Sequence, residues 1–112
     1  MFPQKNRLRK KNDFERVFKQ GRGFREDFLY LKTIKNKLKT SRFAVVVGKD
    51  FSKKAVARNR IKRQINEIIR AELQRIKQGL DIVIVVLPEA KSDFLELKKI
   101  INKLFKKAKI VK

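Results

Sequence analysis

The pattern of apolar and polar residues predicts three strands in this chain. Residues 28–34 are expected to form a strand with Leu29 and Leu31 on one face. Residues 42–48 alternate in the same way, and the short polar segment between the two stretches predicts that they pair antiparallel. Residues 80–87 are apolar on both faces apart from Asp81, which is typical of a buried central strand parallel to a neighbour. The other face of the first strand is expected to hold Phe28, Tyr30, Lys32 and Ile34.

Apolar residues at helical spacing predict three helices around these strands. The first is expected to begin at Asn12, which can cap it, and to end at Gly21. The second runs from about residue 55 to residue 78, before Gly79, and Ser92 can cap the third. The residues expected to face the core are Phe14, Val17 and Phe18 in the first helix, Ile61, Ile65, Ile68 and Ile69 in the second, and Phe94, Leu97, Ile101, Leu104 and Phe105 in the third.

The order of these elements is helix, strand, strand, helix, strand, helix. It predicts an α/β (α+β) fold, in which helices pack on a mixed sheet as a two-layer sandwich. A chain of 112 residues has the size of one domain with a single modest core. We assign residues 12–112 to this domain and residues 1–11 to a basic N-terminal arm that is expected to be mobile in part.

A polar stripe runs beside the apolar stripe of the long helix. At about 100° per residue, its five members fall within roughly a quarter turn of each other. The like charges among them repel each other in the free protein, which is mildly destabilising. A polyanionic partner therefore explains the stripe better than fold stability does. The stripe consists of Asn59, Lys62, Arg63, Asn66 and Arg70.

The overall charge supports a polyanionic partner. Lys and Arg number 32 against 11 Asp and Glu, a formal net charge of +21, which favours nucleic acid through the release of counterions. An anionic membrane is the competing partner, but it usually calls for a basic amphipathic helix with little other core, or for a lipid anchor. The N-terminus has no apolar signal region, and no stretch approaches the roughly 20 apolar residues of a membrane span. We therefore expect a cytoplasmic protein that binds nucleic acid and no membrane.

The composition argues against catalysis by the chain itself. It has no Cys and no His, so disulfides, thiolate chemistry, the commonest metal ligand and the commonest general base are all missing. Most carboxylates fall at helix starts or among basic neighbours, where capping and ion pairing account for them. Asp50 and Asp81 remain, and two are too few for a two-metal nuclease site. We predict no catalytic residue and no metal ligand in the chain.

The run Arg58-Asn59-Arg60-Ile61-Lys62-Arg63 resembles the RNR signature of the bacterial ribonuclease P protein subunit. The six residues are uninterrupted, the elements on both sides fit, and the resemblance extends from about residue 7 to residue 107. It implies one further short strand near residues 23–25, where the residue pattern gives no clear signal. It also implies a left-handed crossover around the long helix, whereas the pattern alone predicts the common right-handed one.

The resemblance also implies a function. In that family the catalyst is an RNA, and the protein is a cofactor of the holoenzyme that hydrolyses precursor tRNA to release the 5′ leader. The implied partners are the ribonuclease P RNA and the leader of precursor tRNA, with Mg²⁺ held mainly by RNA and substrate. No stable protein partner is required.

Three sets of residues follow from the resemblance. The RNR set lies against RNA, because Arg can bind phosphate with two bonds and can stack on bases. A flanking set extends this surface, although Asp50 and Asn66 depart from the basic residues common in the family. A third set faces the single-stranded leader, although helical spacing alone favours a core role for its two phenylalanines. The sets are Arg58, Asn59, Arg60, Lys62 and Arg63; Lys49, Lys53, Lys54, Asn66 and Arg70; and Phe14, Phe18, Tyr30 and Lys32.

Two alternatives are left open. The composition suits a ribosomal or general RNA-binding protein equally well, and the RNR run together with Phe14 and Phe18 distinguishes the enzyme subunit from it. A DNA-binding regulator predicts a helix-turn-helix pair or dimer symmetry. The long helix lies between strands, which disfavours that class.

Overall fold

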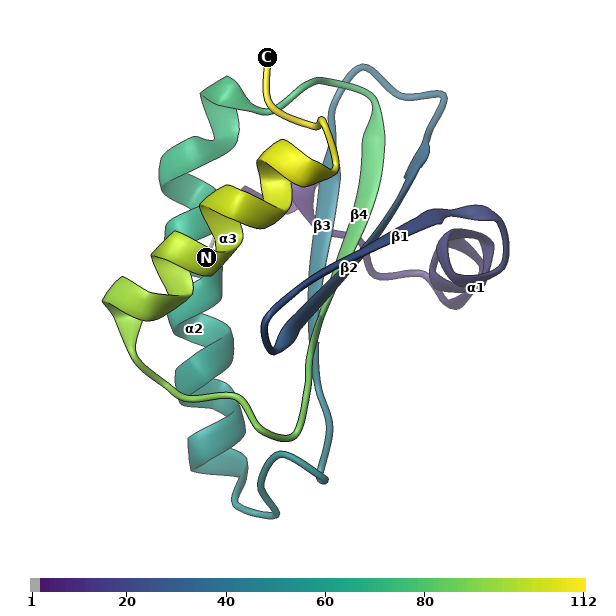
Figure 1. Ribbon diagram of the computed structural model, residues 1–112. Helices are drawn as coiled ribbons and strands as arrows, with labels where there is room; N and C mark the ends of the chain where they lie inside the picture. The colour runs from purple at the N-terminus through teal and green to yellow at the C-terminus, as the bar shows by residue number, and fades with distance from the viewer. Residues whose placement is uncertain (1–2) are drawn as a thin grey trace.

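The computed structural model describes residues 3–112. Within this range, three α-helices and two short 3₁₀ helices surround a four-stranded sheet (Figure 1). The α-helices are α1 (Lys11–Gln20), α2 (Ala55–Glu72) and α3 (Phe94–Lys107), and the 3₁₀ helices are η1 (Gln4–Asn6) and η2 (Leu73–Arg75). The strands are β1 (Arg22–Glu26), β2 (Leu29–Lys35), β3 (Arg42–Val47) and β4 (Leu80–Val86).

The sheet has the strand order β1-β2-β4-β3. Strand β2 pairs antiparallel with β1 and with β4, while β3 pairs parallel with β4. The prediction of a buried strand parallel to a neighbour is therefore confirmed in β4. The predicted antiparallel pairing of residues 28–34 with residues 42–48 is wrong, because β4 lies between those two strands. The strand that is almost wholly apolar takes an inner position between β2 and β3, where all of its residues except Leu80 and Val85 are buried.

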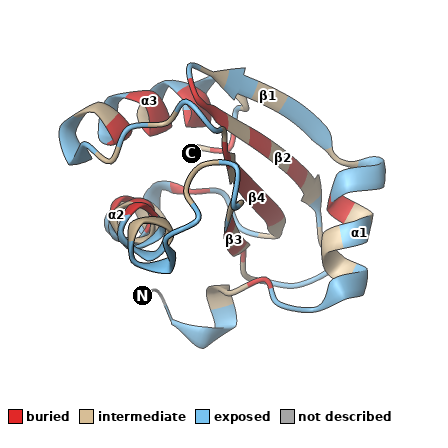
Figure 2. Ribbon diagram, turned by 90° about the horizontal axis from the view of Figure 1, so that it is seen from below, coloured by how far each residue is buried: buried red, intermediate tan, exposed pale blue. Residues whose placement is uncertain are grey.

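Helices cover the two faces of the sheet unequally. Helices α2 and α3 form a layer over one face, which is the predicted packing of helices on a mixed sheet, and α1 covers part of the opposite face (Figures 1 and 2). Seen from the side of α2, with β3 running upward, β4 lies to the left of β3. The β3-α2-β4 crossover is therefore left-handed, as the resemblance implies.

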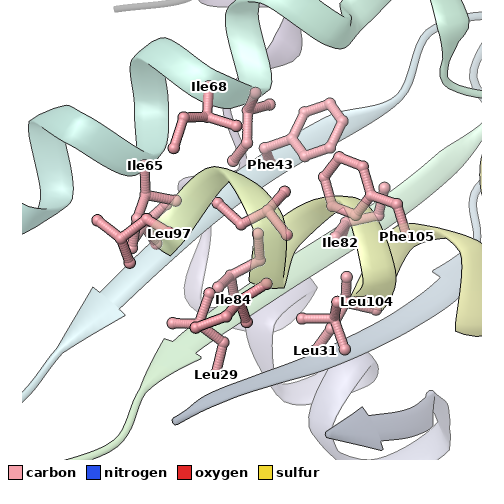
Figure 3. Close-up of a cluster of buried hydrophobic side chains, with 14 of the residues drawn as sticks. Leu29, Leu31, Phe43, Ile65, Ile68, Ile82, Ile84, Leu97, Leu104 and Phe105 are labelled. Carbon is pink, nitrogen blue, oxygen red and sulfur yellow. The ribbon is translucent and has the colours of Figure 1, made fainter. Parts of the chain in front are cut away.

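The main core lies between the sheet and the layer of α2 and α3 (Figure 3). The predicted apolar stripes of α2 and α3 are confirmed, except that Phe94 is 40% exposed and its predicted inward orientation is wrong. Phe94 is the first residue of α3, at the end of the helix that lies away from the sheet (Figure 1). Ile100 joins the buried face instead. The buried residues are Ile61, Ile65, Ile68 and Ile69 on α2, and Leu97, Ile100, Ile101, Leu104 and Phe105 on α3.

Strand β1 is the additional early strand that the resemblance implies. It joins β2 through a two-residue turn of Asp27 and Phe28, in which Asp27 has the left-handed conformation with φ 53°. Phe28 is buried in the main core. The prediction that Phe28 shares a face with Tyr30 is wrong, because the turn, and not strand alternation, sets the direction of Phe28.

The helix starts differ from the prediction in detail. Helix α1 begins at Lys11 with Lys10 as its N-cap and no side-chain cap, so Asn12 is not the capping residue. Helix α3 is capped by Asp93, whose carboxylate accepts from the Glu96 N–H at 3.2 Å. The predicted cap, Ser92, instead donates to Gln64 at 2.5 Å, which ties the start of α3 to α2.

The predicted end of α1 is confirmed, whereas the predicted end of α2 is wrong. Gly21 ends α1, and a Cβ there would collide with the carbonyl oxygen of Val17, so glycine permits the close turn into β1. Helix α2 ends at Glu72, six residues before the predicted end. The chain leaves the helix because Ile76 packs into the core, only 2% exposed, and pairs in a bridge with Val111.

Candidate nucleic-acid interface

A buried ion-pair cluster fixes α1 to the sheet. The side chain of Asp81, on β4, has no exposed surface. Arg42, on β3, donates to both of its oxygens, from Nε at 2.8 Å and from Nη2 at 2.7 Å. Arg16 of α1 and Asn36 each donate to the same carboxylate at 2.8 Å, and Asp13 of α1 pairs with Arg42 at 3.2 Å. Helix α1 is therefore held at two points: Arg16 binds the buried carboxylate of Asp81, and Asp13 binds Arg42.

The cluster also sets the charge of Asp81. Burial by itself raises the pKa of this carboxyl, because a low dielectric disfavours the charged form. The hydrogen bonds and the charge of Arg42, with those from Asn36 and Arg16, outweigh burial and hold the pKa of Asp81 below its ordinary value. The bond to Asp81 raises the pKa of Arg42 in turn. Asp81 is thus accounted for as a structural ion-pair partner.

The aromatic residues of the predicted leader set lie on the α1 side of the sheet. Val17 of α1 is fully buried there and Phe14 is half-buried, whereas Phe18 is 41% exposed. Lys32 of β2 donates from Nζ to the Phe18 carbonyl oxygen at 2.5 Å, which holds β2 against the end of α1. Tyr30 is half-buried on the same face as Lys32. Phe18 and Lys32 are thus in contact. The core role that helical spacing predicts is partly confirmed for Phe14 and is wrong for Phe18.

Tyr30 lies across the neighbouring strand. The space that a Cβ on Gly23 would occupy is filled by the hydroxyl end of the Tyr30 ring. Tyr30 pairs with Val85 of β4, which pairs in turn with Val46 of β3, 36% exposed. This end of the sheet is the end at which β3 leads into α2 (Figure 1). The open apolar face therefore adjoins the start of the basic helix.

The RNR residues occupy the first two turns of α2. Arg58 is half-buried and donates from Nη1 to the Ser52 carbonyl oxygen at 2.9 Å, which ties it to the preceding loop. The other four residues of the set are exposed, and none of the five forms an ion pair with residues 3–112. In the flanking set, Asn66 is half-buried, while Lys49, Lys53, Lys54 and Arg70 are exposed.

One groove is lined by residues from more than one of the predicted sets. Lys62 and Asn66 of α2 and Phe14 of α1 all line it, together with residues of β3. The N-terminal segment lies in the same groove through Arg7 and Arg9. Arg60 does not line this groove. It is two residues from Lys62, so its side chain points about 160° away from that of Lys62 around the axis of α2.

The N-terminal segment was not predicted to contribute. Leu8 is buried, 4% exposed, and its N–H donates to the Phe43 carbonyl oxygen at 2.8 Å. Arg7 pairs with Phe43 in a parallel bridge, so the segment lies along β3. The sequence signal for this contact is Leu8 between Arg7 and Arg9, and one apolar residue is too few to form a periodic pattern. Exposed Val46 was also missed, because alternation along β3 does not show which side lacks a helix.

Within residues 3–112, no group of three or more Asp, Glu, His or Cys side chains is placed to hold a metal ion. In the same part of the chain, no helix is long and apolar enough to span a membrane.

The left-handed crossover, the partly open sheet face and the unpaired cations of α2 define a class of small basic α/β proteins that bind nucleic acid. A family model for ribonuclease P matches residues 2–109. The chain belongs to the ribonuclease P protein family. It is accordingly the protein component of the endonuclease that matures tRNA 5′ ends, and an RNA-binding role without an enzyme is not favoured.

Individual relatives agree with this assignment. The ribonuclease P protein component of a Pseudanabaena species is 40% identical, over 99% of this chain and 97% of that protein. The component of Clostridioides difficile is 36% identical, over 92% and 91% of the two chains. Among solved structures, the Staphylococcus aureus RNase P protein has a TM-score of 0.88 at 28% identity, covering 96% of this chain and 98% of that one. The Thermotoga maritima protein has a TM-score of 0.81 at 31% identity, covering 90% and 96%.

Proposed function

We propose that α2 binds the catalytic RNA of ribonuclease P through the RNR and flanking sets, and that the face beside α1 binds the 5′ leader of precursor tRNA. The observation that carries the proposal is the shared groove, which Phe14, Lys62 and Asn66 line together. Aromatic rings beside cations suit single-stranded RNA, because every base has a face that can stack. A groove that reaches both sets allows one protein to contact the two RNAs at once.

The electrostatics of the groove support this proposal. Its charged lining residues are Arg7, Arg9 and Lys62, and no carboxylate lines it. A one-sign cleft raises the local concentration of polyanions and speeds their association. Cations in such a cleft bind phosphate with the release of counterions.

In this proposal the chain positions RNA and does not carry the reaction. Mg²⁺ would be held mainly by the RNA and the substrate. The chain supplies phosphate contacts and stacking surface, which raise substrate affinity and stabilise the active RNA conformation. Its proposed site of action is the cytoplasm, with the ribonuclease P RNA and precursor tRNA as partners and no stable protein partner.

A reconstitution assay tests the proposal. The protein is mixed with the ribonuclease P RNA of its own source and a precursor tRNA with a 5′ leader, at low magnesium. We expect stimulated cleavage at the mature 5′ end, because the Lys and Arg side chains of the bound protein lower the magnesium concentration needed to screen the RNA phosphates. Tight RNA binding without stimulation would contradict the proposal, and so would cleavage by the protein alone.

Tyr30→Ala is expected to weaken the binding of precursor tRNA by about 1 kcal/mol, since it removes one stacking surface. Binding of mature tRNA, which lacks the leader, should change little. Gly23→Ala is the companion variant, because its Cβ displaces the Tyr30 ring without removing it. Affinities of the reconstituted holoenzyme for the two tRNAs measure the effect. An equal loss for both would remove Tyr30 from the leader surface.

A further inference from the structure

A second groove is lined by residues at the end of β2 and the start of β4. This end of the sheet lies opposite the start of α2 (Figure 1). We call it the α3–β1 groove. It is open to solvent and has a volume of about 540 Å³, within the range of small-molecule and nucleotide sites. Its apolar floor consists of Phe24, Leu80, Ala108 and Ile110. Neither the RNR set nor the leader set lines it.

The rim of the α3–β1 groove is positive. Its four cations come from separate segments of the chain, and no carboxylate lines the groove. None of the four forms an ion pair with any residue in the described range, 3–112. An apolar floor with unneutralised cations at its edge fits a ligand with a flat apolar part and negative charge. The rim cations are Arg22, Lys35, Lys77 and Lys109.

Two further features point to a ligand. Thr33 lines the groove and is 8% exposed, and its hydroxyl has no hydrogen-bond partner in residues 3–112. An unpaired buried hydroxyl is unfavourable unless another molecule supplies the partner. The Arg22 guanidinium lies 5.5 Å from the centre of the Phe24 ring, so a cation and an aromatic surface are already adjacent.

Lys109 stands in a backbone conformation that favours glycine. Its φ is 58°, and it follows the end of α3. Its N–H donates to the Lys106 carbonyl oxygen, and that of Ile110 to Phe105, the bond pattern in which helices commonly end with glycine. A lysine here strains the backbone but adds a cation to the rim. The residue is therefore better explained by its charge than by the fold.

We propose that the α3–β1 groove binds single-stranded RNA, with a base against the apolar floor and phosphates at the rim cations. A strand fits better than a free nucleotide, because four cations from separate segments exceed the need of one phosphate. The groove is separate from the surfaces proposed for the catalytic RNA and the leader. Its lining includes no residue of the RNR, flanking or leader sets, and it lies at the start of β4, whereas Tyr30 pairs with Val85 near the end of β4.

Methyl and amide NMR of the whole chain tests the proposal with three probes: pentauridylate, uridine 5′-monophosphate and inorganic phosphate. We expect saturable shifts at Thr33, Ala108 and Ile110, with pentauridylate binding at least about threefold more tightly than the monophosphate. Phosphate alone should be the weakest. Comparable binding of the mononucleotide and the strand would overturn the assignment to RNA strands. Shifts confined to α2 and the α1 face would overturn this inference and leave the proposed function intact.

Charge-matched variants separate the groove from general attraction. Lys35→Gln with Lys77→Gln should weaken the shifts of the groove residues at least about threefold, because it removes two rim cations. Lys98→Gln with Lys99→Gln removes the same charge from an exposed part of α3 outside the groove and should leave these shifts largely unchanged. Equal losses in the two variants would overturn the proposal.

Lys109→Gly provides a readout that a purely structural role would not give. It should raise the midpoint of thermal unfolding, since glycine relieves the positive φ, and should weaken binding of pentauridylate at the groove. Higher stability with unchanged affinity would remove Lys109 from the proposed site and contradict its assignment.

Discussion

Replacing Asp81 by asparagine is expected to lower the free energy of unfolding by about 3 kcal/mol, the usual result of breaking a buried ion pair by removing one partner. The substitution keeps the size of the side chain but removes the charge that Arg42 and Arg16 share. The side chain of Arg42 is largely buried and that of Arg16 is half-buried, so they lose a partner that water replaces only in part. Urea unfolding followed by circular dichroism measures the change.

Glu89→Gln is the matched control for this variant. It makes the same change from carboxylate to amide in the pair of Glu89 with Arg25, whose side chains are 59% and 58% exposed and 3.3 Å apart. Exposed pairs contribute about 0–1 kcal/mol, so this variant should unfold close to the parent. A loss below about 1 kcal/mol for Asp81→Asn would refute the assigned role of the cluster.

Asp81→Asn also has a predicted consequence for the proposed leader surface beside α1. Helix α1 is held to the cluster by Arg16 and Asp13, and it carries Phe14 and Phe18. Loss of the carboxylate should therefore speed amide hydrogen exchange in α1 more than in α2, because local opening follows the contacts that are lost. The cluster thus connects the stability of the domain with the position of the proposed leader surface.

Acid should reduce stability through Asp81. The folded-state pKa of this carboxyl is depressed, so its stabilising contribution is present above the unfolded value of about 3.9 and is lost as pH falls through the lower folded value. The difference in unfolding free energy between the parent and Asp81→Asn should be constant above about pH 5 and should shrink below about pH 4. Urea titrations at several pH values measure this difference, and one that grew in acid would contradict the depressed pKa.

Replacing Arg58 and Arg63 together by alanine is expected to weaken assembly with the ribonuclease P RNA by about 2 kcal/mol. Arg63 is exposed on α2 without an ion pair to residues 3–112, and Arg58 is tied only to the Ser52 carbonyl. Each lost phosphate contact also removes counterion release, so the slope of log affinity against log salt should flatten by about one per arginine. Filter binding across a range of salt concentrations measures both quantities.

The control for this variant removes two cations from another helix. Lys98→Ala with Lys99→Ala, on α3, lowers the net charge by the same amount and lies outside the first two turns of α2. It should retain most of the affinity and most of the salt slope. If the two variants lost affinity equally, total charge and not the RNR surface would explain binding.

Sequence pattern determined the elements whose environment is simple. The isoleucine stripe of α2 is confirmed because a helix packed on a sheet buries one face, and the period of that face is visible in the sequence. Strand β4 is confirmed as a buried strand, since a strand that is buried over most of both faces is apolar at almost every position. The basic stripe of α2 was visible for the same periodic reason. Its placement against RNA remains a prediction.

Only the tertiary structure decided how these elements meet. Strand β1 has no apolar alternation because it lies at the edge of the sheet, so the residue pattern gave no signal for it. The pairing of β2 with β4 depends on contacts across more than forty residues, which local alternation does not encode. The handedness of the crossover and the position of α1 depend on the assembled layers (Figures 1 and 2).

The candidate sites divide in the same way. The RNR run is contiguous, so the sequence alone identified it together with the family. The meeting of Phe14, Lys62 and Asn66 in one groove required the fold, because three separate elements line it. Asp81 was visible as a charge within an apolar strand, but its partners Arg42, Arg16 and Asn36 are 39, 65 and 45 residues away along the chain. The sequence determined which residues can pack or bind, and the tertiary structure decided which of them meet, because nonlocal contacts form only when the whole core closes.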